Sequence, residues 1–224
     1  MDHLPLPPGV ELLSGIEPRT SRLPATSTLV RIWFAGAPHP SGFACFRSFG
    51  PTASRFDHHL PGPDGRPRHG PRSILYAVVV TAAQAGRTEA LTAAVGEVFQ
   101  QQRVIDMARD EPRLAMFRTV RELRLLDLTG FWATRIGASS AISSGPREIT
   151  RRWSQALYEA FPIADGLLYR SAMSGGRCLA AALYERAEDA LPARPDLDLP
   201  LGHSRLRGPV VAAARRLGYA VLPG

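Results

Sequence analysis

The chain has 224 residues, 45% of them hydrophobic and 21% charged, which is enough for one domain with a full hydrophobic core. Its formal net charge is +7, and every basic side chain other than histidine is an arginine. The absence of lysine excludes a Schiff-base mechanism and a P-loop lysine.

The arginines are compatible with two kinds of anionic partner. A planar guanidinium suits phosphate oxygens, so this composition fits a pyrophosphate ligand or nucleic acid. Codon bias in a GC-rich genome explains the same composition without any ligand. Charge alone therefore leaves the three interpretations open.

Cysteine usage and hydropathy indicate a protein without disulfides, zinc or membrane spans. Cys45 and Cys178 are the only cysteines, and neither has another ligand at metal-binding spacing. The N-terminus lacks the features of a signal peptide, and the longest apolar stretch, residues 74–83, is too short to cross a bilayer. We therefore expect a cytoplasmic protein that does not bind membranes.

Residues 1–28 are predicted to form an N-terminal arm, extended on the surface or partly disordered, because they contain five prolines and no sustained periodicity. Two β-prone runs, 29–34 and 43–49, are separated by a connection rich in glycine and proline and predict neighbouring strands. A polar loop over 60–71 leads to 73–80. That segment is apolar throughout, which predicts a strand covered on both faces.

The middle of the chain contains three predicted helices and one strand. Apolar residues recur at helical spacing over 86–102 and predict an amphipathic helix with Glu97 beside its buried stripe. A second helical stretch is predicted over 113–120, followed by a strand over 123–128. Pro146 occupies the predicted first position of a third helix with one apolar face.

The C-terminal part begins with a predicted hairpin. Its strands are 167–171 and 178–184, which places Ser171 at a strand end. Residues 190–204 are rich in proline and predicted to be irregular, while 209–217 predicts a terminal helix. About six short strands and three or four helices that do not alternate regularly favour an α+β fold over a doubly wound sheet.

Five polar residues with potential for chemistry are spread over the first 171 positions. They are Arg31 opening Arg-Ile-Trp-Phe, Arg55 opening Arg-Phe-Asp, Tyr76 in an apolar run, Glu97 in Thr-Ala-Ala-Val-Gly-Glu-Val, and Ser171 ending Asp-Gly-Leu-Leu-Tyr-Arg-Ser. Their order and spacing resemble the RES domain family. The resemblance covers residues 29–186 and leaves 187–224 as a C-terminal extension with a short helix.

The resemblance implies both a fold and a chemistry. The family is similar to ADP-ribosyltransferases, which implies an α+β fold with a split mixed β-sheet and flanking helices around an NAD cleft. Its characterised members degrade NAD, often as the toxin of a toxin–antitoxin pair, which implies an NAD phosphorylase or glycohydrolase. NAD would be the substrate, with inorganic phosphate as a second one, and no metal or cofactor is implied. The implied partner is an antitoxin, commonly of helix-turn-helix type.

Within this resemblance, Glu97 and Arg31 are the expected catalytic residues, and Arg55, Tyr76 and Ser171 are expected to bind substrate. Cleavage of the nicotinamide–ribose bond builds positive charge on the ribose, which Glu97 would stabilise. Arg31 and Arg55 would hold phosphates, and Tyr76 and Ser171 would hold the nicotinamide end. Each residue also has a structural interpretation, such as a paired strand arginine, an exposed helix glutamate or a core tyrosine.

The segment around Arg55 departs from the family pattern. The family usually has two glycines where this chain has Ala53 and Ser54, so a close approach of the backbone to the ligand is not expected here. Asp57 replaces a frequent asparagine, and an acid there is expected to weaken anion binding unless Arg55 neutralises it. Arg147, at the start of a predicted helix, is a candidate supporting residue for the same anion site.

Other hypotheses use the same residues. Glu89 lies on the same predicted helix as Glu97 and is its rival. Asp57, His58 and His59 suggest a metal site, but adjacent histidines point apart in an extended chain and no further ligand is suitably spaced. The fold could also transfer ADP-ribose to a protein side chain. A third hypothesis is a non-catalytic nucleic-acid-binding module, which is disfavoured because the arginines are dispersed among acids.

Overall fold

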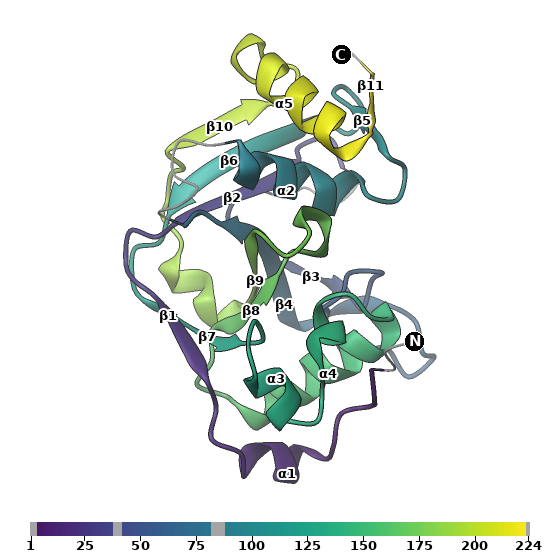
Figure 1. Cartoon of the computed structure of the whole chain (residues 1–224), viewed down its shortest axis with the longest axis vertical. Helices are drawn as coiled ribbons and strands as arrows, with labels where there is room; N and C mark the ends of the chain where they lie inside the picture. Colours follow the sequence, from purple (N-terminus) through teal and green to yellow (C-terminus); the bar gives the residue numbers. More distant parts are fainter. Residues whose placement is uncertain (1–3, 38–41, 82–87, 223–224) are drawn as a thin grey trace.

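One large β-sheet organises the protein. The computed structural model describes residues 4–37, 42–81 and 88–222. In this part of the chain nine strands form one sheet, ordered β1-β7-β8-β9-β4-β2-β6-β10 with β3 paired to β4 (Figure 1). The pairing of β7 with β8 is parallel, and the other neighbours are antiparallel. The strands are β1 (Thr20–Leu23), β2 (Thr28–Phe34), β3 (Arg47–Gly50), β4 (Arg68–Val79), β6 (Pro112–Arg118), β7 (Leu123–Asp127), β8 (Gly166–Arg170), β9 (Leu179–Tyr184) and β10 (Leu197–Pro200).

The sheet splits between β2 and β4. These strands pair at two positions, Leu29 with Val79 and Val30 with Val78. Beyond Val30, β2 continues along β6, whereas β4 continues between β9 and β3. Two branches therefore diverge from one junction, and the predicted α+β fold with a split mixed sheet is confirmed.

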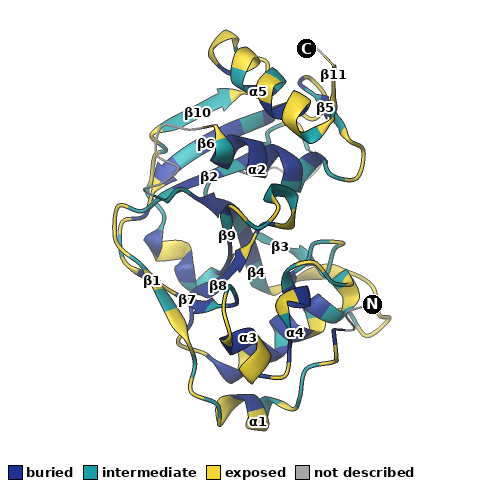
Figure 2. Ribbon diagram, in the orientation of Figure 1, coloured by how far each residue is buried: buried dark blue, intermediate teal, exposed yellow. Residues whose placement is uncertain are grey.

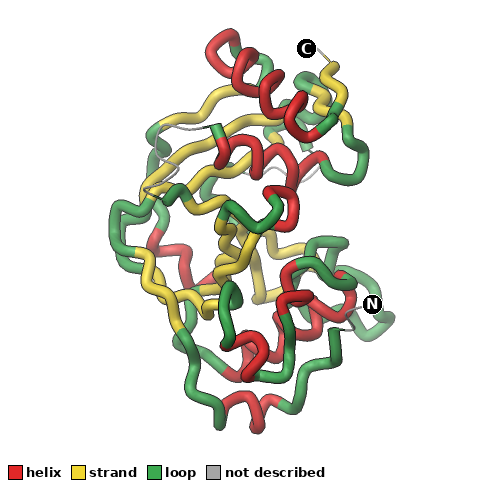
Figure 3. The backbone as a smooth tube through the Cα atoms, in the orientation of Figure 1, coloured by secondary structure: helices red, strands yellow, loops and turns green. Residues whose placement is uncertain are grey.

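Helices cover the two branches separately (Figures 1 and 3). The β2–β6 branch carries α2 (Glu89–Phe99) and α5 (Ser204–Leu217), with a parallel ribbon of β5 (Val104–Asp106) and β11 (Ala220–Leu222) beside them. The other branch carries α1 (Val10–Ser14), α3 (Trp132–Arg135) and α4 (Arg147–Ala160). Three 3-10 helices also occur in the described chain, namely η2 (Ser140–Ser143), η3 (Ala172–Ser174) and η4 (Glu185–Ala190). None of the described helices is long and apolar enough to cross a membrane.

Strand β4 connects the three apolar clusters of the core. Ile74 packs into the cluster around α4, and Val78 packs into the cluster under α2 and α5. Leu75 and Ala77 point to the opposite face, where η4 covers the sheet. This alternation has the period of two that a strand imposes. Buried residues also lie in α2 and α4, the helices over the two branches (Figure 2). The predicted strand with two covered faces is therefore confirmed.

The N-terminal arm is anchored in the core beside α4. Leu4 and Leu13 are 1% and 0% exposed and belong to the same cluster as Trp153 of α4. The indole N–H of Trp153 donates to the carbonyl of Pro5 at 2.8 Å, and β1 then extends the sheet beside β7. Helix α1 forms between Pro8 and Pro18, so the arm is not wholly extended, and Leu4 and Leu13 fasten it to the domain.

The predicted helix over 113–120 is wrong, because this segment is strand β6. Leu114 packs under α2 and α5, whereas Ala115 and Phe117 pack on the opposite face of the sheet. A short apolar run cannot distinguish a buried strand from a buried helix by periodicity. The pairing of β6 with both β2 and β10 decides the outcome.

Two further predictions need correction, while the other main elements are confirmed. The run 43–49 contributes β3, which pairs with β4 rather than with β2. Residues 190–204 are not wholly irregular, since β10 forms an edge strand beside β6, a position where its proline is tolerated. The predicted helices around Glu97 and after Pro146 are α2 and α4, the hairpin is β8–β9, and the terminal helix α5 begins earlier than predicted.

Candidate active site

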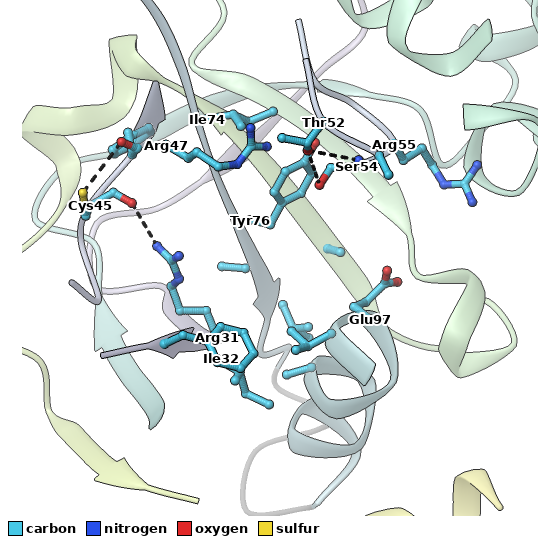
Figure 4. A pocket seen from close by; sticks show the side chains of 18 of the residues that line it. Arg31, Ile32, Cys45, Arg47, Thr52, Ser54, Arg55, Ile74, Tyr76 and Glu97 are labelled. Atoms are coloured by element: carbon cyan, nitrogen blue, oxygen red, sulfur yellow. Dashed lines mark hydrogen bonds between the residues drawn. The ribbon is translucent and has the colours of Figure 1, made fainter. Parts of the chain in front are cut away.

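A cavity of about 710 Å³ opens where the sheet splits. Its walls come from β2 beyond Val30, from β4, from the loop after β3 and from α2 (Figure 4). This volume lies within the range of small-molecule and cofactor sites. The divergence of β2 from β4 leaves space in the middle of the sheet, and residues far apart in the sequence meet around it.

The cavity is strongly cationic. Four arginines line it, namely Arg31, Arg47, Arg55 and Arg147, whereas Glu97 is the sole carboxylate among the described lining residues. Arginines that are partly removed from water require anionic or hydrogen-bonding partners. The composition of the wall therefore favours a ligand with negative charge.

Glu97 enters the cavity from the last turns of α2. The Ser171 hydroxyl donates a hydrogen bond of 2.6 Å to its Oε1 atom. Burial raises the pKa of the Glu97 carboxyl, and this effect outweighs the Ser171 hydrogen bond and the charges of Arg55 and Arg147. Glu97 is thus a desolvated carboxylate with two guanidinium groups nearby.

Ser171 stands behind Glu97 rather than in the cavity wall. It is 0% exposed and does not line the cavity. It immediately precedes η3, and its backbone N–H donates to the carbonyl of Cys178 across the hairpin. The structure therefore brings together Ser171 and Glu97, as the family resemblance implied, but through direct contact with each other.

Gly96 permits this contact. A Cβ atom at this position would lie 2.8 Å from the Cβ of Met173, so only glycine allows α2 to approach η3 this closely. We expect Gly96→Ala to push η3 away and to lower the free energy of unfolding by about 1–3 kcal/mol, as overpacking does. Thermal or urea denaturation measures this change.

Gly208 of α5 provides the matched control. A Cβ atom there meets nothing within 4 Å, and the position is exposed on a helix. Gly208→Ala should therefore change the free energy of unfolding by less than about 1 kcal/mol, because the gain in helix propensity is opposed by Pro209, which disfavours a helical residue with a Cβ before it. Equal stability changes for the two variants would contradict the packing role of Gly96.

Arg31 is the first residue of β2 beyond the split. Its Nη1 donates to the carbonyls of Phe43 and Cys45 at 3.1 and 3.3 Å, and burial lowers its pKa to about 10. Its Nε is buried and has no hydrogen-bond partner among the described residues. Figure 4 shows Arg31 across the cavity from Glu97, and no hydrogen bond or ion pair joins these two described residues. Arg31 and Glu97 therefore line the same cavity on different walls.

Arg55 and Tyr76 also line the cavity. Arg55 Nη1 donates to the carbonyl of Gly145 at 2.6 Å, and burial lowers its pKa despite the nearby Glu97 charge. The Tyr76 hydroxyl donates to Asp57 at 3.0 Å and accepts from the Phe56 N–H at 3.1 Å. Tyr76 therefore presents its ring to the cavity, with its hydroxyl already occupied.

Arg47, which the motif comparison did not single out, is the cation that neutralises Asp57. Its Nη2 lies 2.5 Å from Asp57 Oδ1, so Arg47 and not Arg55 is the arginine that pairs with this acid. The position of Arg47 at the end of a β-prone run could have suggested a strand arginine. Its partner could not be inferred, because β3 and the Asp57 loop meet only in the folded chain.

The loop around Arg55 is held in place by α4. Ala53 and Ser54 both have negative φ, so the conformation of the loop does not require the missing glycines. One face of α4 donates to five of its carbonyls. The bonds run from Arg147 to Ala53, Thr150 to Arg55, Arg151 to Thr52, Ser154 to Phe56 and Gln155 to His59, at 2.7–3.1 Å.

Comparison with known proteins identifies the family. The family model described as RES domain matches residues 28–202. The chain belongs to the RES domain family. No curated protein matches it in sequence.

The fold of this RES domain is similar to a solved structure, the crystal structure of the M. tuberculosis MbcT–MbcA toxin–antitoxin complex. The TM-score is 0.52, the sequence identity is 17%, and the match covers 89% of this chain and 96% of that one. At this identity the similarity supports the fold. It extends over most of the chain, including parts of the segments beyond residues 29–186.

Two histidines of this RES domain, His58 and His59, are buried outside the lining of the cavity. His58 and His59 are 0% and 2% exposed, and their Nε2 atoms donate to Glu185 at 3.3 Å and to the Arg47 carbonyl at 2.9 Å. No group of three or more possible metal ligands occurs among the described residues. Burial lowers the pKa of both histidines and outweighs the effects of Glu185 and the Arg47 carbonyl.

These two histidines predict how stability depends on pH. Because their folded pKa values lie below the unfolded value of about 6.5, the unfolded chain binds more protons as the pH falls below 6.5. We expect the free energy of unfolding to fall by up to about 1.4 kcal/mol per pH unit for each histidine in that range. Urea denaturation between pH 7.5 and 5 measures it, and His58→Phe should reduce the slope. A slope unaffected by that change would contradict the assignment.

Proposed function

We propose that this RES domain degrades NAD by cleaving the bond between nicotinamide and ribose. The observation that carries the proposal is the partly buried carboxylate of Glu97, the sole carboxylate among the described lining residues, oriented by Ser171 inside a cavity lined by arginines. A site that combines one fixed carboxylate with several cations suits a substrate that has a diphosphate and develops positive charge at a nearby sugar.

In the proposed reaction, an oxygen of phosphate or water bonds to the ribose carbon as the bond from this carbon to nicotinamide breaks, and an attacking water releases one proton to bulk solvent. Nicotinamide leaves with the bonding electron pair, which neutralises the charge on its ring nitrogen. The transition state carries positive charge on the ribose, and Glu97 stabilises it and orients the ribose hydroxyls. NAD is itself the substrate, so this chemistry requires no metal and no further cofactor.

The remaining residues bind and orient the substrate in this proposal. Arg55, supported by Arg147, holds the diphosphate close to Glu97, and Arg31 contacts phosphate oxygens from the opposite wall. The ring of Tyr76 packs against the nicotinamide ribose. Ser171 acts on Glu97 instead of on nicotinamide, because its hydroxyl is buried and bonded to that carboxylate.

We also propose that the protein is the toxin of a toxin–antitoxin pair. Support comes from membership of the family and from a fold similar to a chain of a toxin–antitoxin complex. The proposed partner is an antitoxin, of the helix-turn-helix type, that covers the cavity. Co-expression with the neighbouring gene product should restore growth that this chain inhibits, and growth inhibition without any rescue would reject the pairing.

NAD turnover by purified protein tests the reaction. Incubation with phosphate should yield nicotinamide and phosphorylated ADP-ribose if the enzyme is a phosphorylase. Free ADP-ribose without a phosphate requirement would indicate a glycohydrolase, and label transferred from NAD to protein would indicate an ADP-ribosyltransferase. Intact NAD under all conditions, with a folded protein, would refute the proposal.

A further inference from the structure

The carboxylate of Asp57 lies behind the cavity wall and accepts hydrogen bonds from several of the residues that form it. It is 0% exposed and does not line the cavity, yet it accepts four hydrogen bonds. Its Oδ1 accepts from Arg47 at 2.5 Å and from the Tyr76 hydroxyl at 3.0 Å. Its Oδ2 accepts from the backbone N–H and the hydroxyl of Thr52, at 2.7 and 2.8 Å. All of the bonds reach donors that themselves line the cavity.

The three donors come from different parts of the fold. Arg47 belongs to β3, Tyr76 to β4, and Thr52 to the loop that leads to Arg55. Figure 4 shows Arg47 pointing toward Tyr76 and Thr52, on the wall opposite α2. One carboxylate therefore joins side chains of β3 and β4, which pair as neighbouring strands, to the loop that leads to Arg55.

The partners of Asp57 also fix its charge. Desolvation alone would raise the pKa of Asp57, but the Arg47 charge and the hydrogen bonds from Arg47 and Thr52 hold it below its ordinary value. Asp57 is thus ionised and balances Arg47 within the wall. Among the described lining residues, Arg31, Arg55 and Arg147 then supply the cationic charge that is not balanced by Asp57.

We infer that Asp57 is a positioning residue: through Arg47, Thr52 and Tyr76 it sets the wall on which the substrate rests, without touching the substrate. The inference rests on the proposed function for its ligand, a molecule containing ADP-ribose. Asp57 thus has a role in substrate binding, although an acid at this position was expected to weaken anion binding. The Tyr76 hydroxyl matters here only because it anchors the ring to Asp57.

A variant that loses one hydrogen bond to Asp57 and keeps the rest of the side chain tests this inference. Tyr76→Phe keeps the ring and removes its bond to Asp57. We expect the Kd of ADP-ribose, measured by calorimetry, to rise about five- to tenfold and the KM for NAD to rise in parallel, with kcat changed less than threefold. Stacking by the ring alone predicts no change. Asp57→Asn should raise both constants further.

Tyr158→Phe is the matched control. The Tyr158 hydroxyl donates to Glu185 at 2.5 Å, so this variant also removes a bond between tyrosine and carboxylate, but outside the cavity. Its Kd for ADP-ribose should equal that of the wild type. Equal Kd and KM values for wild type, Tyr76→Phe and Asp57→Asn would overturn the inference.

A charge-compensated pair separates positioning from folding. Arg47→Met leaves Asp57 buried without its cation and should lower the unfolding midpoint, whereas Arg47→Met with Asp57→Asn should recover stability but not affinity. Affinity that recovers with stability would indicate a merely structural role and overturn the inference. If wild-type protein binds ADP-ribose but leaves NAD intact, the proposed reaction fails, while the binding comparison still decides the role of Asp57.

Discussion

Glu97→Gln is expected to lower kcat for NAD cleavage by about two to three orders of magnitude, while KM changes little. The substitution keeps the shape of the side chain and its capacity to accept the Ser171 hydrogen bond. It removes the negative charge that stabilises the transition state, and loss of such a group typically costs about 10²–10³ in kcat. Release of nicotinamide, followed over time, measures the effect.

Glu89→Gln is the control, because Glu89 lies on the same helix and was the rival candidate. It sits at the opposite end of α2, does not line the cavity and lies 3.9 Å from Arg216. NAD cleavage by this variant should stay within about twofold of the wild type, as for a weak surface ion pair. Equal losses in the two variants would show that the helix, and not the Glu97 carboxylate, is required.

The pH profile provides a second test of the same residue. Because burial raises the pKa of Glu97 above its ordinary 4.5, protonation abolishes activity as the pH falls through a value above 4.5. The residual activity of Glu97→Gln should lack this acid limb. An identical limb in wild type and variant would assign it to another group.

Arg55→Met should raise the KM for NAD by about 10- to 100-fold, which corresponds to the loss of charge-assisted hydrogen bonds to phosphate. Arg55 is fixed by its bond to the Gly145 carbonyl, and the α4 bonds hold its backbone, so the cation is preorganised for the diphosphate. Arg55→Lys keeps the positive charge but lacks the planar guanidinium, so its KM should lie between those of the wild type and Arg55→Met. Initial rates over a range of NAD concentrations measure the change.

Arg152→Met controls for the loss of one positive charge. Arg152 is an exposed residue of α4 that lies 3.3 Å from Glu148, and it does not line the cavity. Its KM should match the wild type, since exposed ion pairs contribute little. A comparable rise in KM would attribute the Arg55 effect to the general electrostatic field of the protein.

The local elements were predictable where periodicity or turn chemistry was strong. Helix α4 was predicted from its apolar face, which includes Trp153 and Leu157, and from the proline before it. The β8–β9 hairpin was predicted from the turns that flank its strands. The segment 113–120 failed because its apolar residues suit a buried helix and a buried strand equally. Only the neighbours on both sides of β6 distinguish them.

The sequence by itself determined the α+β class, the family and the residues that meet at the split. It did so because hydrophobic periodicity is local, and because the five motif residues occupy short, characteristic segments. The tertiary structure alone decided which of these residues touch. The contact between Ser171 and Glu97 depends on the close packing of α2 against η3 that Gly96 allows because it has no Cβ. The pairing of Arg47 with Asp57 depends on how β3 packs against β4. Such distances arise from packing between distant segments, which no local pattern records.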